Sequence, residues 1–266
     1  MSKESRLGSS TKTAVQLAPS VGQGPRRAIP VVIPKRILIF APHADDEVLS
    51  CGGAILKYAQ WGTESVVLVA TPGIGGSPNL RKPGKVEKTR RKEFETCKRE
   101  LHLSDLSEFL SIDEPLVCQT NVELFTRKIR ELKPDLVFLP HPEDRHRVHR
   151  EVSLLTLEAL FHSPTGAYAG AGREWLPYGA YCYESISGIF GTTIPARTLA
   201  ISDITSQYHE KVRIMRRAYR TQSRLLRTYM SWIESVARLR GFAGRCEYGE
   251  AFVPETGHVP LKMLVV

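Results

Sequence analysis

The sequence predicts an α/β fold, a layered domain with a mostly parallel sheet, followed by a C-terminal extension that includes a long amphipathic helix. Two observations predict the layered part. Short apolar runs rich in β-forming residues, at 36–41, 65–70 and 135–140, are typical of strands buried on both faces of a parallel sheet. Helix-like segments separate these runs, and an alternation of strands and helices is typical of α/β layers.

The predicted elements of the core follow in chain order. The first strand leads to a helix at about 47–61, and the second strand leads to a long loop at 71–85 that holds four Gly and three Pro. Loops of this length are commonly functional or mobile. Charged helices are expected at 87–101 and 121–133, and the third strand is followed by a helix at about 150–161.

The two ends of the chain depart from this alternation. Residues 1–34 are rich in Ser, Gly, Pro, Lys and Arg without periodicity, and we expect a mobile basic tail. Residues 35–266 then form a single domain, with the core in 35–162 and an elaboration in 163–266. The elaboration is expected to contain strands near 180–186 and 198–202 and a helix from about 205 to 240. Residues spaced three and four apart predict the inner face of that helix: Val212, Met215, Tyr219, Gln222, Leu226, Tyr229, Ile233 and Val236.

The charge and cysteine content restrict the class of protein. The formal net charge of +9 directs attention to nucleic acid or anionic membranes, but residues 1–35 and 210–240 carry more than this excess and the remainder is slightly acidic. We therefore expect no nucleic-acid and no membrane partner, and keep a basic nucleic-acid-binding adaptor as the alternative function. Five cysteines without a CxxC pair, and the lack of a spanning or signal-like apolar run, predict a cytoplasmic protein.

Two polar clusters directly follow predicted strands. His43, Asp45, Asp46 and Glu47 follow the first strand, and the histidine-rich segment 141–149 follows the third. A single acidic residue after a strand is commonly a helix cap, but three acids and a histidine within five residues exceed that need. Ligands of parallel α/β sheets bind at the carboxyl ends of the strands, so we expect the two clusters to lie together.

The residue types in these clusters indicate metal-assisted hydrolysis. His146 and His149 are three residues apart, and two histidines with one carboxylate form a metal site that leaves positions open for water and substrate. Of two adjacent aspartates, one can bind the metal while the other accepts a proton from the attacking water. Amide hydrolysis is a natural use of such a site. Non-haem iron oxygenases share the ligand set, but the aspartate pair has no role there.

Five segments resemble a known family, the LmbE-like or N-acetylglucosaminylphosphatidylinositol de-N-acetylases. The likeness spans about residues 35–254. The first two segments are similar to the family's opening motif, the third to its second motif and the last two to its C-terminal segments: His43-Ala-Asp-Asp-Glu47, Leu49-Ser-Cys-Gly-Gly53, His146-Arg-Val-His149, Lys211–Gln222 and Arg240–Phe252.

This resemblance implies a Rossmann-like, zinc-dependent N-deacetylase, with Fe²⁺ as the alternative metal. By position, His43, Asp46 and His149 would be the metal ligands and Asp45 the general base. His146 would be the acid or electrophile that faces the amide oxygen. The implied partner is a small N-acetylated amino sugar or its conjugate, with glycopeptide or aminoglycoside antibiotic intermediates among the relatives' substrates. Another metal-dependent amidase is the alternative within the same chemistry.

The resemblance also implies a substrate-binding arginine from an Arg-x-x-Glu helix. Arg90 and Glu93 match that pattern, although Arg91 is adjacent and leaves the assignment open between the two arginines. We expect Arg90 to touch the substrate.

Three positions depart from the family pattern. Ala44 replaces a common proline, which should relax the turn without removing a ligand. Val148 replaces an acidic residue that orients the catalytic histidine in many members, so His146 needs another partner, for which Asp144 is the candidate, or acts with a lowered pKa. Tyr219 replaces a histidine that is common in the C-terminal helix.

Overall fold

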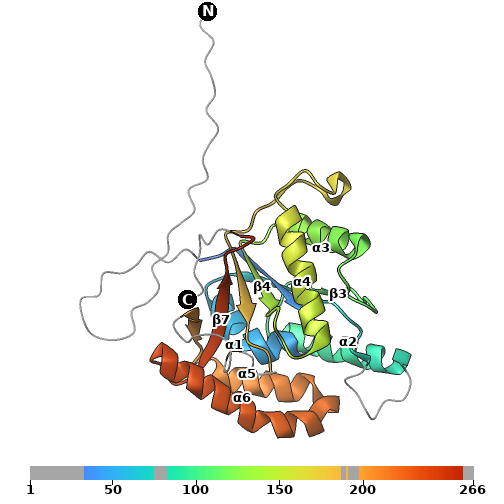
Figure 1. Cartoon of the computed structure of the whole chain (residues 1–266). Coiled ribbons are helices and arrows are strands. Elements are labelled where there is room, and N and C mark those ends of the chain that lie inside the picture. The colour runs from blue at the N-terminus through green and yellow to red at the C-terminus, as the bar shows by residue number, and fades with distance from the viewer. Residues whose placement is uncertain (1–32, 75–82, 187–189, 191–197, 260–266) are drawn as a thin grey trace, which may run out of the picture. The chain divides into compact units, whose positions relative to one another are not determined.

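The sheet confirms the predicted fold class. The structure, a computed structural model, describes residues 33–74, 83–186, 190 and 198–259. Within them, strands β1 to β7 form one sheet in the order β3-β2-β1-β4-β5-β7-β6, in which β7 runs antiparallel to β5 and β6 and the other pairings are parallel (Figure 1). The strands are β1 (Arg36–Ala41), β2 (Glu64–Val69), β3 (Glu108–Phe109), β4 (Leu136–Pro140), β5 (Gly179–Tyr183), β6 (Ala200–Asp203) and β7 (Gly249–Glu255).

Helices cover both faces of the sheet. The helices are α1 (Asp46–Gln60), α2 (Pro83–Glu100), α3 (Gln119–Leu132), α4 (Arg147–His162), α5 (Tyr208–Ala218) and α6 (Ser223–Gly244). Alternate residues of β1 point to opposite faces, so that Leu38 and Phe40 pack with α3 and α4 while Ile37 and Ile39 pack with α1, α2 and α5. Figure 1 shows α5 and α6 on the α1 side. These two apolar layers hold the strand ends in fixed positions.

Two predicted segments fall mostly outside the described residues. The predicted basic tail comprises residues 1–34, of which the structure describes only 33 and 34. Of the predicted loop 71–85, residues 75–82 are likewise not described. The single domain over 35–266 stays a prediction.

The helix expected at 205–240 is interrupted. Helix α5 ends at Ala218, a short 3₁₀ turn covers Arg220–Gln222, and α6 begins at Ser223. The break lies at Tyr219, whose φ and ψ of −100° and 49° leave the helical region while its side chain is fully buried. Sequence periodicity continues through the break because Tyr219 and Gln222 both face inward. The pattern therefore located the inner face but not the bend.

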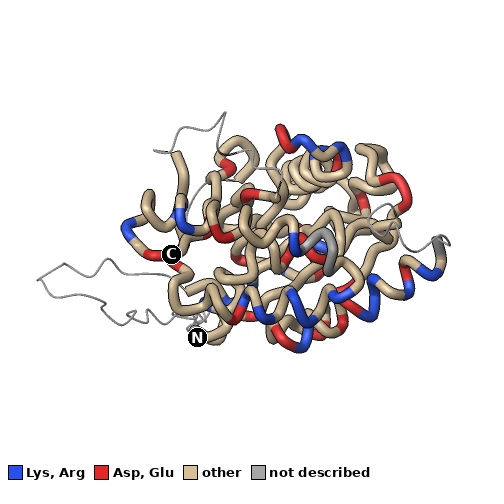
Figure 2. The backbone as a smooth tube through the Cα atoms, turned by 90° about the horizontal axis from the view of Figure 1, so that it is seen from below, with Lys and Arg blue, Asp and Glu red and all other residues tan. Residues whose placement is uncertain are grey.

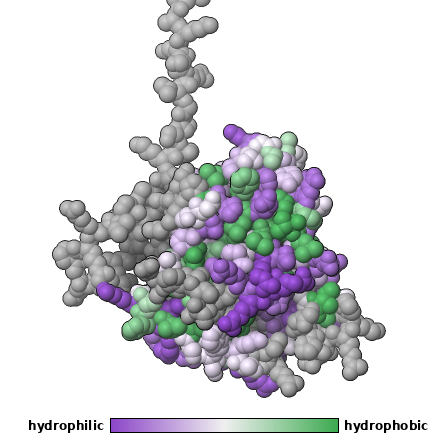
Figure 3. Space-filling view, viewed as in Figure 1, coloured by the Kyte–Doolittle hydropathy of each residue, from purple (hydrophilic) through white to green (hydrophobic). Residues whose placement is uncertain are grey.

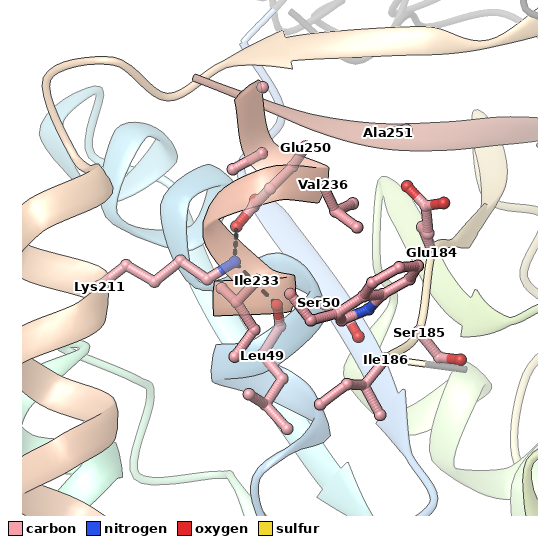
Figure 4. A pocket seen from close by; sticks show the side chains of 13 residues that line it. Leu49, Ser50, Glu184, Ser185, Ile186, Lys211, Ile233, Val236, Glu250 and Ala251 are labelled. Atoms are coloured by element: carbon pink, nitrogen blue, oxygen red, sulfur yellow. Dashed lines mark hydrogen bonds and ion pairs between the residues drawn. The ribbon is translucent and has the colours of Figure 1, made fainter. Parts of the chain in front are cut away.

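Strand β7 was not recognised in the sequence, and it carries a buried ion pair. Glu250 on β7 bonds the ammonium of Lys211 on α5 at 2.7 Å, and its two oxygens accept the backbone N–H groups of Gly53 and Ala54 in α1. Lys211 also donates to the carbonyl of Leu49 at 2.7 Å (Figure 4). The pair thus joins β7, α5 and α1, three elements that lie far apart in sequence.

Loss of this ion pair is expected to cost much of the stability of the domain. Lys211→Met leaves Glu250 buried without its cation, and breaking a buried pair from one side costs about 3–5 kcal/mol. Lys128→Met is the control, because that lysine forms surface pairs with Glu108 and Glu131 that are worth about 0–1 kcal/mol. Urea unfolding measures the free energy of unfolding of both variants and of the wild type. A loss below about 1 kcal/mol for Lys211→Met would contradict the structural role.

The surface of the described domain mixes charges of both signs. Figure 2 shows basic and acidic positions interspersed along the backbone. Arg213 pairs with Glu100 and Glu210, whereas Arg240 is buried and binds Glu184 through two hydrogen bonds of 2.6 and 2.7 Å. The arginines of 210–240 are therefore partly neutralised within the domain, and one of them is a core residue.

Apolar side chains are also exposed in places. Leu154 and Phe161 of α4 are about half exposed, and Figure 3 shows hydrophobic side chains on the side of the molecule that carries α3 and α4. Among the described residues, we find no helix with the length and apolar character needed to cross a bilayer.

Candidate active site

The two polar clusters meet at the carboxyl ends of neighbouring strands. Strands β1 and β4 are parallel and adjacent, so the segments that follow them emerge at one edge of the sheet. Asp46 begins α1 directly after β1, and His149 lies in the first turn of α4 after β4. The sequence places each residue locally, and the parallel pairing brings them together.

His43, Asp46 and His149 converge on one point. Asp46 Oδ2 lies 3.4 Å from His43 Nδ1 and 3.4 Å from His149 Nε2. One ligand atom from each of the three residues lies within 4.8 Å of the others. Asp46 and His149 are buried, and the His43 side chain is one quarter exposed. Burial raises the pKa of Asp46, but the neighbouring His149 and His43 outweigh it and lower the pKa, which keeps the carboxylate ionised.

Asp144 fixes the orientation of His149. Its Oδ2 lies 3.0 Å from His149 Nδ1 and accepts a hydrogen bond from the Ser185 hydroxyl. Burial raises the pKa of Asp144, but the bonds from His149 and Ser185 outweigh it and hold the pKa well below its ordinary value. An ionised Asp144 keeps the proton of His149 on Nδ1. Burial lowers the pKa of His149, but Asp46 and Asp144 outweigh it and raise the pKa. The other ring nitrogen, Nε2, faces Asp46 and is the atom that could bind a metal ion.

The donor set fits a divalent metal ion. Two imidazoles and one carboxylate are suitable ligands for zinc or ferrous iron, and a ligating histidine commonly donates its second N–H to a carboxylate. The contact between His149 and Asp144 supplies that feature here. Among the described residues, His43, Asp46 and His149 are the group with metal-binding spacing.

Asp45 lies beside the three converging residues and lines the same cavity. Burial and then the Asp46 carboxylate raise the pKa of Asp45 well above its ordinary value, and the Arg90 guanidinium opposes this shift. A carboxylate with a raised pKa accepts a proton from water more readily. Asp45 also has an uncommon backbone conformation, with φ at 128°.

His146 contacts both candidate histidine ligands. Its ring centroid lies 5.0 Å from that of His43 and 4.8 Å from that of His149. Asp144 accepts the backbone N–H of His146 at 2.7 Å, so it holds the main chain of this residue and the ring of His149. Of the two expectations for His146, a partner in Asp144 or a lowered pKa, the second agrees with the structure. Desolvation and then the two neighbouring imidazoles lower the pKa of His146, which favours its neutral form near pH 7.

The structure distinguishes the two adjacent arginines. Arg90 is buried and lines the cavity, whereas Arg91 is exposed and bonds Glu87 and Ser111. Glu93 lies 3.4 Å from Arg90. The Arg-x-x-Glu pattern thus corresponds to an arginine that faces the cavity and a glutamate beside it.

The cavity has a volume of about 610 Å³ and contains residues that sequence reasoning did not assign. A volume of this size suits a sugar or a small conjugate. Asp113 and Glu114 follow β3, a strand of two residues that leaves no periodic pattern in the sequence. Gln222 lines the cavity because the bend between α5 and α6 turns it inward, and its Nε2 has no hydrogen-bond partner among the described residues. The remaining unassigned lining residues are Leu49, Thr71, Pro72, Gly73, Ile74, Val148, Ile186 and Tyr229.

Comparison with known proteins agrees with this resemblance. The family model described as GlcNAc-PI de-N-acetylase (PIG-L) matches residues 38–160, which include most of β1, all of β4 and the polar segments that follow both strands. Over these residues, the chain is similar to that family. The family resemblance predicted from the motifs is confirmed.

The match to a curated family relative covers part of each chain. The diacetylchitobiose deacetylase of Thermococcus kodakarensis is 29% identical over 134 residues, which are 47% of this chain and 49% of that protein. The match therefore spans about half the length of the relative.

Solved structures with the same fold include enzymes of different reaction classes. The N,N'-diacetylchitobiose deacetylase from Pyrococcus horikoshii, solved with an inhibitor, has a TM-score of 0.73 at 22% identity over 84% of this chain and 85% of that one. GalB, the 4-carboxy-2-hydroxymuconate hydratase from Pseudomonas putida, also has a TM-score of 0.73, at 21% identity over 85% and 98%. These likenesses establish the fold alone, and the residues of the site must indicate the reaction.

Proposed function

We propose that this protein hydrolyses the acetamide of an N-acetylglucosamine-containing small molecule and releases acetate and a free amine. One observation carries the proposal. A carboxylate with a raised pKa, Asp45, lies in one cavity with a buried two-histidine, one-carboxylate donor set. Amide hydrolysis needs a group that takes a proton from the attacking water, and beside it a centre that polarises the carbonyl. Asp45 suits the first role, and a metal ion in the donor set would suit the second.

His43, Asp46 and His149 are the proposed metal ligands, with zinc as the proposed ion and Fe²⁺ as the alternative. A divalent ion held there would lower the pKa of water and polarise the amide carbonyl. The chain's own contribution is to hold the three donors together, with Asp144 fixing the ring of His149.

Asp45 and His146 are the proposed catalytic residues. Asp45 accepts a proton from the water as it attacks the acetyl carbonyl carbon. The C–N bond then breaks, and the leaving nitrogen takes a proton to become the free amine. His146 lies beside both histidines of the donor set, and burial and these two imidazoles lower its pKa, which favours a neutral ring that can hydrogen-bond the amide oxygen and assist departure of the amine.

Polar residues around the cavity support a sugar-containing substrate. Arg90, Asp113 and Glu114 offer charged donors and acceptors for ring hydroxyl or amino groups. Gln222 adds an amide whose Nε2 lacks a partner among the described residues. The acidic pair suits a substrate with further amino groups, and a role in aminoglycoside or glycopeptide antibiotic biosynthesis stays a prediction.

Amine release from a panel of N-acetylated sugars tests the proposed function. We expect the purified protein to deacetylate at least one of N-acetylglucosamine, N,N'-diacetylchitobiose and an N-acetylated aminoglycoside. The expected preference over the poorest member is about tenfold or more, because a site that hydrogen-bonds its substrate rejects analogues that leave its polar groups unpaired. Equal and feeble rates on every member would contradict the sugar specificity and favour another metal-dependent amidase.

A nucleic-acid-binding adaptor is the alternative from another class, suggested by the net charge of +9. It predicts DNA binding that weakens steeply as salt is raised. No binding at low salt, together with amine release from a panel member, would exclude it.

A further inference from the structure

The backbone of Asp45 has a conformation that side-chain-bearing residues rarely adopt. Its φ and ψ are 128° and −27°, outside the allowed regions of an L-residue. Such a conformation is energetically unfavourable and persists only where surrounding contacts enforce it. The strain falls at the residue that we propose as the general base.

A chain of two hydrogen bonds leads from this residue into the core. The backbone N–H of Asp45 donates to Glu47 Oε2 at 2.9 Å. The other carboxylate oxygen of Glu47, Oε1, accepts a hydrogen bond from the hydroxyl of Tyr219. Glu47 and Tyr219 are both fully buried. Tyr219 lies at the bend between α5 and α6, so this link connects the C-terminal part of the domain with the turn after β1.

We propose that Glu47 and Tyr219 are positioning residues that hold the strained Asp45 backbone and thereby aim its carboxylate into the cavity. The inference rests on the proposed function, because it assumes that Asp45 acts as the base. Tyr219 fixes the rotamer of the Glu47 side chain, and Glu47 in turn fixes the amide of Asp45. Without the tyrosine hydroxyl, the Glu47 carboxylate loses its hydrogen bond from the bend between α5 and α6, and the Asp45 backbone is free to relax toward an allowed conformation.

The candidate metal ligands are held by a separate set of contacts. Asp46 accepts the backbone N–H of His43 at 2.9 Å, and Asp144 holds the ring of His149. Neither contact involves Glu47 or Tyr219. Loss of the Tyr219 hydroxyl is therefore expected to change the catalytic rate constant and not the affinity for metal or substrate.

Tyr219→Phe tests the inference in the full-length, zinc-loaded protein. We expect kcat to fall by about 10- to 100-fold, since misplacement of a reacting group by about 1 Å can cost about 100-fold. KM and zinc affinity should stay at the wild-type values. Tyr183→Phe is the matched control, because the Tyr183 hydroxyl is also buried and donates to the backbone carbonyl of Phe40 at 2.9 Å. The control should keep the wild-type kcat.

Glu47→Gln separates hydrogen bonding from charge. A glutamine can accept the Asp45 N–H with its oxygen and donate its amide N–H to the Tyr219 hydroxyl, so both links survive. We expect this variant to keep most of the kcat that Tyr219→Phe loses. A wild-type kcat in Tyr219→Phe, or equal losses in Tyr219→Phe and Glu47→Gln, would overturn the inference.

A crystal structure of Tyr219→Phe supplies a readout that does not depend on activity. We expect φ of Asp45 to leave the positive region. A φ that stays near the wild-type 128° would overturn the inference even if the protein deacetylates no sugar on the panel. Wild-type inactivity on the panel would count against the proposed function alone, and the backbone of Asp45 would still decide whether Tyr219 holds it.

Discussion

Asp45→Asn is expected to abolish nearly all turnover while the protein keeps its metal. Asparagine has the shape of aspartate but cannot accept the proton of the attacking water, and general base catalysis is commonly worth about 10²- to 10⁴-fold. The backbone N–H that bonds Glu47 is unchanged by the substitution, so the turn should persist. Steady-state amine release and metal analysis of the same preparation measure the two properties.

Asp105→Asn is the matched control for this variant. Its side chain is fully exposed, and its pair with Lys98 in the described part of the chain is a long surface contact of 3.7 Å. Wild-type turnover is expected. An Asp45→Asn protein with activity within about tenfold of the wild type would show that another group serves as the base.

His149→Ala is expected to remove both metal binding and activity. The substitution deletes one of three proposed ligands and leaves the buried Asp46 and Asp144 carboxylates without the imidazole between them. Changes to residues that merely support a ligand typically cost about 10- to 100-fold in metal affinity, so loss of a ligand should cost about 100-fold or more. Calorimetric titration of chelator-treated protein with Zn²⁺ measures the effect.

The control for this titration lies on the same helix. His162 ends α4, where its Nε2 contacts Glu158 at 3.1 Å, away from the candidate site. His162→Ala should bind one Zn²⁺ per chain as the wild type does. A titration of the wild type with Fe²⁺ under argon measures its affinity for the alternative metal, to be compared with its affinity for Zn²⁺. Undiminished zinc binding by His149→Ala would place the ion elsewhere.

Much of the site was predictable because it depends on local sequence and one general rule. The strand at Arg36–Ala41 and the strand at Leu136–Pro140 are apolar runs that stand out in the sequence. Polar residues that follow parallel strands share an edge of the sheet, and this rule places the cluster at 43–47 beside the segment 141–149. The choice of His43, Asp46 and His149 as ligands came from the family resemblance.

The parts that were missed depend on tertiary contacts. The bend at Tyr219 arises from burial of its side chain and its bond to Glu47, and neither disturbs the helical spacing of the sequence. Strand β7 enters between β5 and β6 from the end of the chain, and Gly249–Glu255 does not read as a buried run. The contact of Asp144 with the ring of His149 was not foreseen, since Asp144 was considered only as a partner for His146. Spacing alone could not distinguish the two.

The charge of the chain illustrates the same limit. The segment 210–240 holds much of the positive charge of the chain, and Arg213 and Arg238 lie exposed on helix surfaces, paired with Glu210 and Glu234. Arg240 instead binds Glu184 in the core. A residue's sign of charge is read from the sequence, whereas its partner depends on the fold.

Hydrolysis in water enriched in ¹⁸O tests the central claim most directly. The account predicts that the wild-type protein converts an N-acetylated amino sugar into a free amine and acetate that carries one ¹⁸O atom, because the attacking oxygen comes from water that has lost a proton to Asp45. Mass spectrometry of the acetate measures the label. Label in the sugar product with the acetyl group still attached would indicate addition of water, as in a hydratase, and would contradict amide hydrolysis at this site.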